Sequence, residues 1–310
     1  MYNEELKNRF IKMRNDDVIL APRYFERLFA KTEMFEELLQ KDCSCWTKVN
    51  IMDFYKYLST PSLETLIDNN NKLSQYCQFC LQESLVPDHQ NHYLEMTTDN
   101  IVSCISKTAI SKKVITRERL LISLNSIQNV VDKFIALACF EGFKGGCYKE
   151  IWQLHTSDID TENNTVTLCT GRTINISQEL IDLAFESASI YKYYTISSSG
   201  KSKIRSLYGD ADLIVKVSGN AADDENQAGK RIRARIIKNI RNIGLDESLG
   251  GNALYISGMI EMINRLAREN NMTAKDVLYN KELLAMIEQQ YCSIKQTRLR
   301  FLKKYEEFLV

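Results

Sequence analysis

The stretch "KGGCYKEIWQLHTSDID", residues 144–160, decides how the second half of this chain is organised. It follows an apolar segment, residues 130–140, whose pattern is typical of a buried helix. It precedes "TVTLCTGRTINIS", residues 165–177, in which Thr170-Gly171 separates two short runs rich in Thr, Val and Ile. A buried helix, a glycine-containing turn and a small antiparallel hairpin or three-stranded sheet are therefore predicted in this order.

The composition is that of a globular protein with few tight turns. Hydrophobic residues make up 44% of the 310 residues and charged residues 26%, with three prolines and twelve glycines. These values favour a mainly helical chain of about two domains. No apolar run approaches the ~18 residues of a membrane span, and the charged N-terminus is unlike a signal peptide. We therefore expect a cytoplasmic protein with no membrane partner.

The chain is predicted to divide near residue 112. Apolar positions at helical spacing recur through residues 4–41 and 45–85, which predicts a helical bundle over residues 1–112. Residues 113–310 are predicted to form a second helical domain that carries the small sheet, with one more strand over residues 213–217. The predicted fold class is mainly α with a small antiparallel β-sheet.

The order of these elements resembles that of the tyrosine recombinases, the phage-integrase family. Their catalytic domain carries a motif of the form T-G-x-R-x-x-E-(L/I)-x-x-L-x-x-x-D-I-D, followed by a β-hairpin. Here Gly145 takes the glycine, Glu150 and Ile151 the E-L pair, and residues 158–160 the closing triplet. The first domain resembles the helical, SAM-like core-binding domain of the family. The resemblance implies a two-domain tyrosine-recombinase-like architecture.

The departures from the family motif fall on its catalytic positions. Where the family has two arginines that hold the scissile phosphate, a histidine and a third basic residue, this chain has Cys147, Tyr255, Asn252 and Asn280. The hairpin lysine that acts as general acid has no counterpart, and the nearest base, Arg172, is a guanidinium that stays protonated. Tyr291 could be a vestigial nucleophile, but its helix is apolar and favours a packing role. The resemblance thus implies an inactive site and no enzyme.

The strongest local indication of DNA binding is "KRIRARIIKNIRNIG", residues 230–244. Isoleucines at helical spacing form one stripe, and Arg231, Arg235 and Lys238 line another face. Such a helix can dock on a core and present cations to phosphates. The alternative is an ordinary solvated surface helix.

Other basic residues are weaker candidates for DNA contacts. They lie at the hairpin tip, in a Gly/Ser-rich loop and at the domain junction: Arg172; Lys201, Lys203 and Arg205; Lys112 and Lys113. The alternatives are a solvated turn for Arg172, a polar linker for Lys112 and Lys113, and a mobile surface loop for the other three, which the Gly/Ser-rich sequence favours.

Nine cysteines, an odd number, favour free thiols in a reducing compartment. Two pairs, Cys43-x-Cys45 and Cys77-x-x-Cys80, have spacings found in zinc sites, yet the second pair falls inside a helical pattern and favours small core residues. We therefore predict no metal and no cofactor. The amphipathic segment 294–310 is predicted to mediate self-association or to dock on its own core.

In the "FEG" segment at residues 140–142, the "CWT" region at residues 45–47 and the C-terminal helices, the chain resembles the recombinase-like master repressors of SPbeta-type temperate phages. That resemblance implies a sequence-specific, double-stranded DNA-binding transcriptional repressor that maintains lysogeny, nucleoid-associated in the bacterial host cytoplasm, with a peptide or protein antagonist as a possible further partner. Two alternatives stay open. One is a divergent active recombinase that uses Tyr291 with substitute cations such as Lys144, Lys149 or Arg172. The other is an integrase-like protein that acts through protein–protein contacts.

Overall fold

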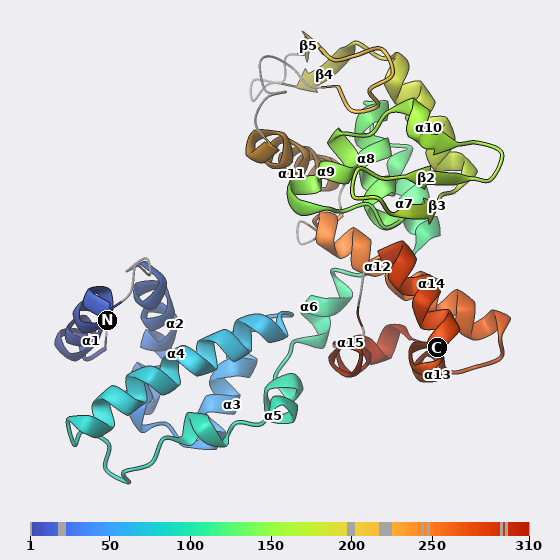
Figure 1. Cartoon of the computed structure of the whole chain (residues 1–310). Helices are drawn as coiled ribbons and strands as arrows, with labels where there is room; N and C mark the ends of the chain where they lie inside the picture. The colour runs from blue at the N-terminus through green and yellow to red at the C-terminus, as the bar shows by residue number, and fades with distance from the viewer. Residues whose placement is uncertain are drawn as a thin grey trace. The chain divides into compact units, whose positions relative to one another are not determined.

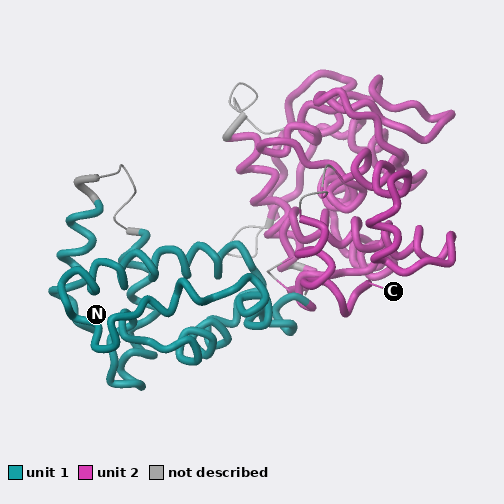
Figure 2. The backbone as a smooth tube through the Cα atoms, turned by 60° about the horizontal axis from the view of Figure 1, so that its bottom comes forward, with its two compact units in different colours: residues 1–110 teal, residues 111–310 magenta. Residues whose placement is uncertain are grey.

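The computed structural model describes residues 2–17, 23–196, 202–216, 225–243, 245–246, 249–291, 294 and 297–309. The chain forms two compact units, Met1–Ile110 and Ser111–Val310 (Figure 2). Both are built mainly from α-helices, and the antiparallel sheets are small, as the sequence predicts. Within the part of the chain described, no helix combines the length and the apolarity needed to cross a membrane.

Unit 1 is a helical bundle. Its helices are α1 (Glu4–Asp17), α2 (Arg23–Leu39), α3 (Lys48–Tyr57), α4 (Leu63–Gln82), α5 (Thr98–Ser103) and, at the unit boundary, α6 (Lys107–Ser111). An aromatic cluster joins α1, α2 and α4, with the Phe10 ring packed edge-on against Phe25 and Tyr76 at centroid distances of 5.1 and 5.3 Å. A fully buried ion pair between Lys7 and Glu36 adds a polar link between α1 and α2.

Unit 2 is assembled around one apolar helix. Its helices are α7 (Arg117–Leu124), α8 (Val130–Phe140), α9 (Lys149–Trp152), α10 (Gln178–Ser189), α11 (Glu225–Asn242), α12 (Gly251–Glu269), α13 (Ala274–Tyr279), α14 (Lys281–Tyr291) and α15 (Arg298–Tyr305) (Figure 1). Every residue of helix α8 from Val131 to Phe140 except Lys133 is buried, because α10, α11 and α12 pack around the helix. At Gly258 on α12 an added Cβ would lie only 1.7 Å from the Phe140 carbonyl oxygen, so the two helices cross at a glycine.

The predicted sheet follows α9 as β1 (Ile159–Asp160), β2 (Thr165–Thr167) and β3 (Thr173–Asn175), all antiparallel. Val166 and Ile174 are partners in the register and are both buried. The alternation of these apolar residues with threonine and asparagine explains why one face of the sheet packs on the core.

Two predictions for the following region were wrong. The basic loop contains a hairpin, β4 (Lys192–Ile196) with β5 (Ser202–Ser206), in which Tyr194 is the register partner of Ile204. Aromatic and β-branched residues favour strands, which explains the hairpin despite the serines in this sequence. The strand predicted over residues 213–217 does not form in the described residues 213–216: Leu213 makes only an isolated bridge with His155. Its apolar residues Ile214 and Val215 are buried in a loop instead.

Helix α15 docks on its own unit. Phe301 is buried in a cluster with residues of α12, α13 and α14, and the Asn264 side chain donates a hydrogen bond of 2.7 Å to the Phe308 carbonyl. Of the two roles predicted for this segment, the intramolecular one is therefore present. Self-association through α15 stays a prediction.

Candidate nucleic-acid interface

The turn between α8 and α9 places Cys147 at the position of the first family arginine. Three residues in this turn, Gly145, Cys147 and Tyr148, have positive φ values between 51° and 60°. Cys147 is exposed, but Gly229 of α11 lies against its backbone: an added Cβ there would be 2.6 Å from the Cys147 carbonyl oxygen. Helix α11 therefore packs directly against this turn. Because Cys147 has a thiol in place of a guanidinium, this position has no permanent positive charge with which to bind a phosphate.

The second substituted box lies at the start of α12. Asn252 is exposed and accepts a hydrogen bond of 3.1 Å from the Lys144 ammonium, which also lies 4.6 Å from the centroid of the Tyr255 ring. Tyr255 is itself buried. One exposed cation, Lys144, therefore remains among these positions, held by a hydrogen bond and a cation–π contact.

Glu150 and Arg172 form the most heavily hydrogen-bonded ion pair of this region. The buried Glu150 carboxylate accepts from the Arg172 guanidinium at 2.7 and 3.1 Å, from the Thr170 hydroxyl at 2.6 Å and from the Lys144 backbone N–H at 2.7 Å. Burial alone would raise the pKa of Glu150, but these hydrogen bonds and the guanidinium charge outweigh it and lower the pKa. The carboxylate is therefore held in its ionised form.

Arg172 directs all of its N–H groups into the protein. Besides Glu150, the guanidinium donates to the backbone carbonyls of Gly142 at 3.1 Å, Gln289 at 3.3 Å and Gln290 at 3.2 Å. A guanidinium has five N–H donors, and these five bonds use them all. The carbonyls at the end of α14 otherwise lack helical partners, so Arg172 caps that helix where its dipole favours a cation. This role leaves no donor for a DNA phosphate.

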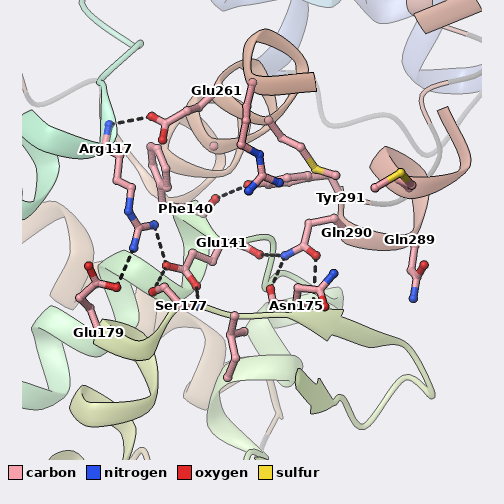
Figure 3. Close-up of a pocket in the computed structure, with 15 residues that line it drawn as sticks. Arg117, Phe140, Glu141, Asn175, Ser177, Glu179, Glu261, Gln289, Gln290 and Tyr291 are labelled. Atoms are coloured by element: carbon pink, nitrogen blue, oxygen red, sulfur yellow. Dashed lines mark hydrogen bonds and ion pairs between the residues drawn. The ribbon is translucent and has the colours of Figure 1, made fainter. Parts of the chain in front are cut away.

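Tyr291 ends α14 and is buried, with 5% of its surface exposed. Its hydroxyl donates a hydrogen bond of 2.8 Å to the Phe140 carbonyl (Figure 3). Its ring packs edge-on against Tyr255 at a centroid distance of 5.3 Å. Burial raises the pKa of Tyr291 well above its ordinary value, and the nearby carboxylates of Glu141 and Glu261 add to the effect. In this position the hydroxyl is a packing group and not an accessible nucleophile.

The neighbouring residues hold α14 in this place. The Gln290 side chain accepts from the Asn175 N–H at 3.1 Å and donates to the Asn175 carbonyl at 2.8 Å, so it pairs with β3 as a strand residue would (Figure 3). It also donates to the Glu141 carbonyl at 2.6 Å. At the other end of α14, Asn280 accepts from the N–H groups of Glu282 and Leu283 at 3.0 and 3.1 Å. Asn280, which stands where the family has its third basic residue, is therefore a helix cap.

Helix α11 presents cations on the side away from its isoleucines. Ile232, Ile236 and Ile240 are buried as predicted, and Lys238 is exposed. Arg231 is half-buried, and the Arg235 side chain is only 14% exposed.

Three exposed cations of α11, Lys230, Arg233 and Arg241, were missed by sequence reasoning. Helical phase places Lys230 outside the isoleucine stripe, which the sequence could have revealed, whereas Arg233 lies at the edge of the stripe and gives no such signal.

The remaining predicted contacts are spread over unit 2. Lys203 and Arg205 lie on β5, which is exposed at every position, and Lys201 lies outside the described residues. The exposed Lys112 ammonium is 3.9 Å from an Asp246 carboxylate oxygen. Lys113 is half-buried beside it.

The cysteine pairs have the environment of core thiols. Cys77 and Cys80 are buried in α4, and burial raises their pKa values to about 12 and about 11. In the described residues, the one cluster with metal-ligand geometry is Glu36, Asp42 and Cys43. Both Glu36 oxygens already accept hydrogen bonds from the Lys7 ammonium, at 2.7 and 2.5 Å, so a cation occupies the place of a metal.

Comparison with known protein families gives a match in each of the two units. Residues 1–82 match the family described as "MrpR, N-terminal core-binding domain", and residues 114–306 match "MrpR, C-terminal catalytic domain". A relative from Bacillus subtilis (strain 168), the "SPbeta prophage-derived uncharacterized protein YopR", is 21% identical over 287 residues, which are 90% of this chain and 86% of the relative.

Solved structures that match this chain include the integrase from mycobacterium phage Brujita and the XerA recombinase. The integrase is 13% identical with a TM-score of 0.34, covering 97% of both chains. XerA is 11% identical with a TM-score of 0.39, covering 96% of this chain and 93% of its own. The family matches, which span most of the sequence with both of its domains in order, are what identify it: the chain belongs to the MrpR family of degenerate, recombinase-like proteins.

Proposed function

We propose that this protein binds double-stranded DNA sequence-specifically, as a transcriptional repressor that maintains the lysogeny of a temperate phage, and does not cut the DNA. The observation that carries the proposal is the exposed cation face of α11, formed by Lys230, Arg233 and Lys238. The opposite face of the helix is buried in the core of unit 2, so the cations are held on a rigid element. Rigid, exposed cations are what phosphate contacts require.

The geometry of the former active site supports binding without cleavage. Stabilising the charge of a phosphoryl transition state is usually the largest contribution to this kind of catalysis. Cys147 and Tyr255 replace the cations that would supply it, and Arg172 is fully engaged inside the protein. Tyr291, the residue that would attack, is buried with its hydroxyl hydrogen-bonded.

The biological setting is inferred from the relatives. The relative from Bacillus subtilis is described as prophage-derived, and the family description names a core-binding domain for residues 1–82. We therefore infer a phage or prophage protein that acts on operator DNA in the cytoplasm of the bacterial host, associated with the nucleoid. In this proposal unit 1 assists unit 2 in gripping the duplex.

The proposed DNA contacts combine α11 with weaker sites. In addition to the exposed face of α11, they include Arg231, Lys201, Lys203, Arg205, Lys112, Lys113 and Lys144. Arg172 and Arg235, although predicted as contacts from the sequence, are left out of this set because their side chains are directed into the protein.

The test is a gel-shift titration with the purified chain against fragments of the genome that encodes it, with excess nonspecific competitor and a series of salt concentrations. We expect selective retention of a few intergenic fragments, with log affinity falling linearly against log salt. Uniform weak binding, or none, would contradict the proposal and direct the search toward protein partners.

A further inference from the structure

We propose that Arg235 is a positioning residue: through Asp132 and Tyr193 it fixes α11 relative to the β4–β5 hairpin, so that the cations of both elements meet DNA in one register. The inference rests on the proposed function and deepens it. It replaces the predicted phosphate contact at Arg235 with an internal role. It also names a residue that sets specificity without touching DNA.

Arg235 is placed between the two elements. Its Nε lies 3.9 Å from Asp132 Oδ1 on α8, and its guanidinium lies 4.6 Å from the centroid of the Tyr193 ring on β4. The Tyr193 hydroxyl in turn donates a hydrogen bond of 2.7 Å to the other oxygen of Asp132. Three elements, α8, α11 and β4, therefore meet at one carboxylate whose side chain is fully buried.

The hairpin is attached to α8 at a second point. Asn129, the residue before α8, accepts from the Tyr194 N–H at 2.9 Å and donates to the Tyr194 carbonyl at 3.0 Å. Successive residues of β4 are thus fixed, Tyr193 by its side chain and Tyr194 by its backbone. The hairpin that bears Lys203 and Arg205 consequently has a defined orientation on α8. Helix α11 packs on α8 through its isoleucines, and Arg235 is the residue of α11 that contacts both Asp132 and the Tyr193 ring of the hairpin.

The cluster is incompletely hydrogen-bonded. Asp132 Oδ1, Arg235 Nη1 and Asn239 Nδ2 are buried and have no hydrogen-bond partner within the described structure. Unpartnered buried polar atoms weaken a fold, and an apolar core of the same volume would often be more stable. This charged cluster lies between α11 and the β4–β5 hairpin and contains donors and acceptors without partners. It therefore fits a role in orienting the two elements better than a role in stabilising the fold.

The test compares Arg235→Gln with Lys238→Gln, an exposed cation three residues further along the same helix. Binding to the best retained fragment and to competitor DNA is titrated over a salt series. For Arg235→Gln we expect at least a tenfold loss in the ratio of specific to nonspecific affinity. The slope of log affinity against log salt concentration, called the salt slope below, should not change. Lys238→Gln should lower the salt slope by about 0.9 and leave the ratio unchanged.

The double variant Asp132→Asn/Arg235→Gln decides between the two roles, and it also guards against a single variant that fails to fold. It replaces the charges with a neutral polar pair, so it should recover most of the lost specificity if Arg235 acts by positioning. A salt slope lowered by about 0.9 in both Arg235 variants, with no recovery in the double variant, would overturn the proposal in favour of a direct phosphate contact.

Hydrogen exchange of the chain without DNA separates this inference from the proposed function. Arg235→Gln should speed amide exchange in β4 by at least tenfold relative to wild type, whereas Lys238→Gln should not. Unchanged exchange in β4 would overturn the positioning role even if DNA binding is confirmed. Faster exchange in a protein that retains no DNA would refute the proposed function alone.

Discussion

Two arginine–carboxylate pairs of unit 2, each with a buried carboxylate, differ in geometry. Arg172 and Glu150 are 2.7 Å apart, and every N–H of the guanidinium has an acceptor. Arg235 and Asp132 are 3.9 Å apart, and each has an atom without a hydrogen-bond partner in the described structure. The first pair joins the hairpin tip to α9 and α14, and the second lies behind the exposed face of α11.

The pKa values of the two carboxyl groups shift in opposite directions. Burial pushes both upward, but at Glu150 the hydrogen bonds from Arg172, Thr170 and the Lys144 N–H prevail and lower the pKa. At Asp132 burial prevails over Arg235 and Tyr193, and the pKa is raised. The difference teaches that an arginine beside a carboxylate forms a fixed cross-link only when hydrogen bonds satisfy both groups, as they do for Arg172 and Glu150.

Breaking the satisfied pair should have the largest effect. Arg172→Ala leaves a buried carboxylate and three backbone carbonyls without their donor, so unit 2 should lose about 3 to 5 kcal/mol of unfolding free energy, measured by urea denaturation. Arg119→Ala, which removes an exposed cation from α7, is the matched control and should change stability by less than about 0.5 kcal/mol. Equal, small effects of the two variants would show that Arg172 is a surface residue in solution.

Lowering the pH should change the free energy of unfolding in opposite directions through the carboxyl groups of Glu150 and Asp132. Because the folded-state pKa of Glu150 is lowered, its contribution to stability is present above its ordinary pKa and is lost as pH falls through the folded-state value. The folded-state pKa of Asp132 is raised, so protonation of this carboxyl group as the pH falls favours the folded state. The effect of Asp132 on stability therefore partly offsets the loss at Glu150.

Stability measured between pH 7 and pH 3 should therefore respond oppositely to two variants. The acid-induced loss should be smaller in Glu150→Gln than in wild type, and larger in Asp132→Asn. Identical pH profiles for all three proteins would contradict the assignment of these shifts.

A smaller effect is expected at Tyr291. Tyr291→Phe removes one hydrogen bond to the Phe140 carbonyl and should cost about 1 kcal/mol of unfolding free energy, with DNA affinity unchanged. Wild type should form no covalent adduct with a nicked suicide substrate of the retained DNA. An adduct that wild type forms and Tyr291→Phe does not would restore the active-recombinase alternative.

The sequence predicted what short-range pattern determines. The order of buried helix, turn and sheet around residues 144–177 and the isoleucine stripe of α11 were correct because both depend on local periodicity. The β4–β5 hairpin was missed, since serine-rich segments hide strands that pair only in the folded context.

The roles of Arg172 and Arg235 could not be predicted from local pattern. The acceptors of Arg172 include carbonyls more than a hundred positions away, and Arg235 finds Asp132 and Tyr193 only once α11 packs on α8. Helical periodicity predicted on which side of α11 Arg235 lies, but it could not predict which residues pack against that side. Exposure, and not charge alone, separates the cations that can meet DNA from those that hold the fold.

The most direct test of the account is the salt dependence of DNA binding by Lys230→Ala/Arg233→Ala/Lys238→Ala, set beside a control that removes three exposed cations elsewhere in unit 2, at Arg119, Lys275 and Lys281. Both variants change the net charge equally. We expect the α11 variant to lower the slope of log affinity against log salt by about 2 to 3, and the control to retain the wild-type slope. Equal slopes for the two variants would contradict the claim that α11 carries the DNA contacts.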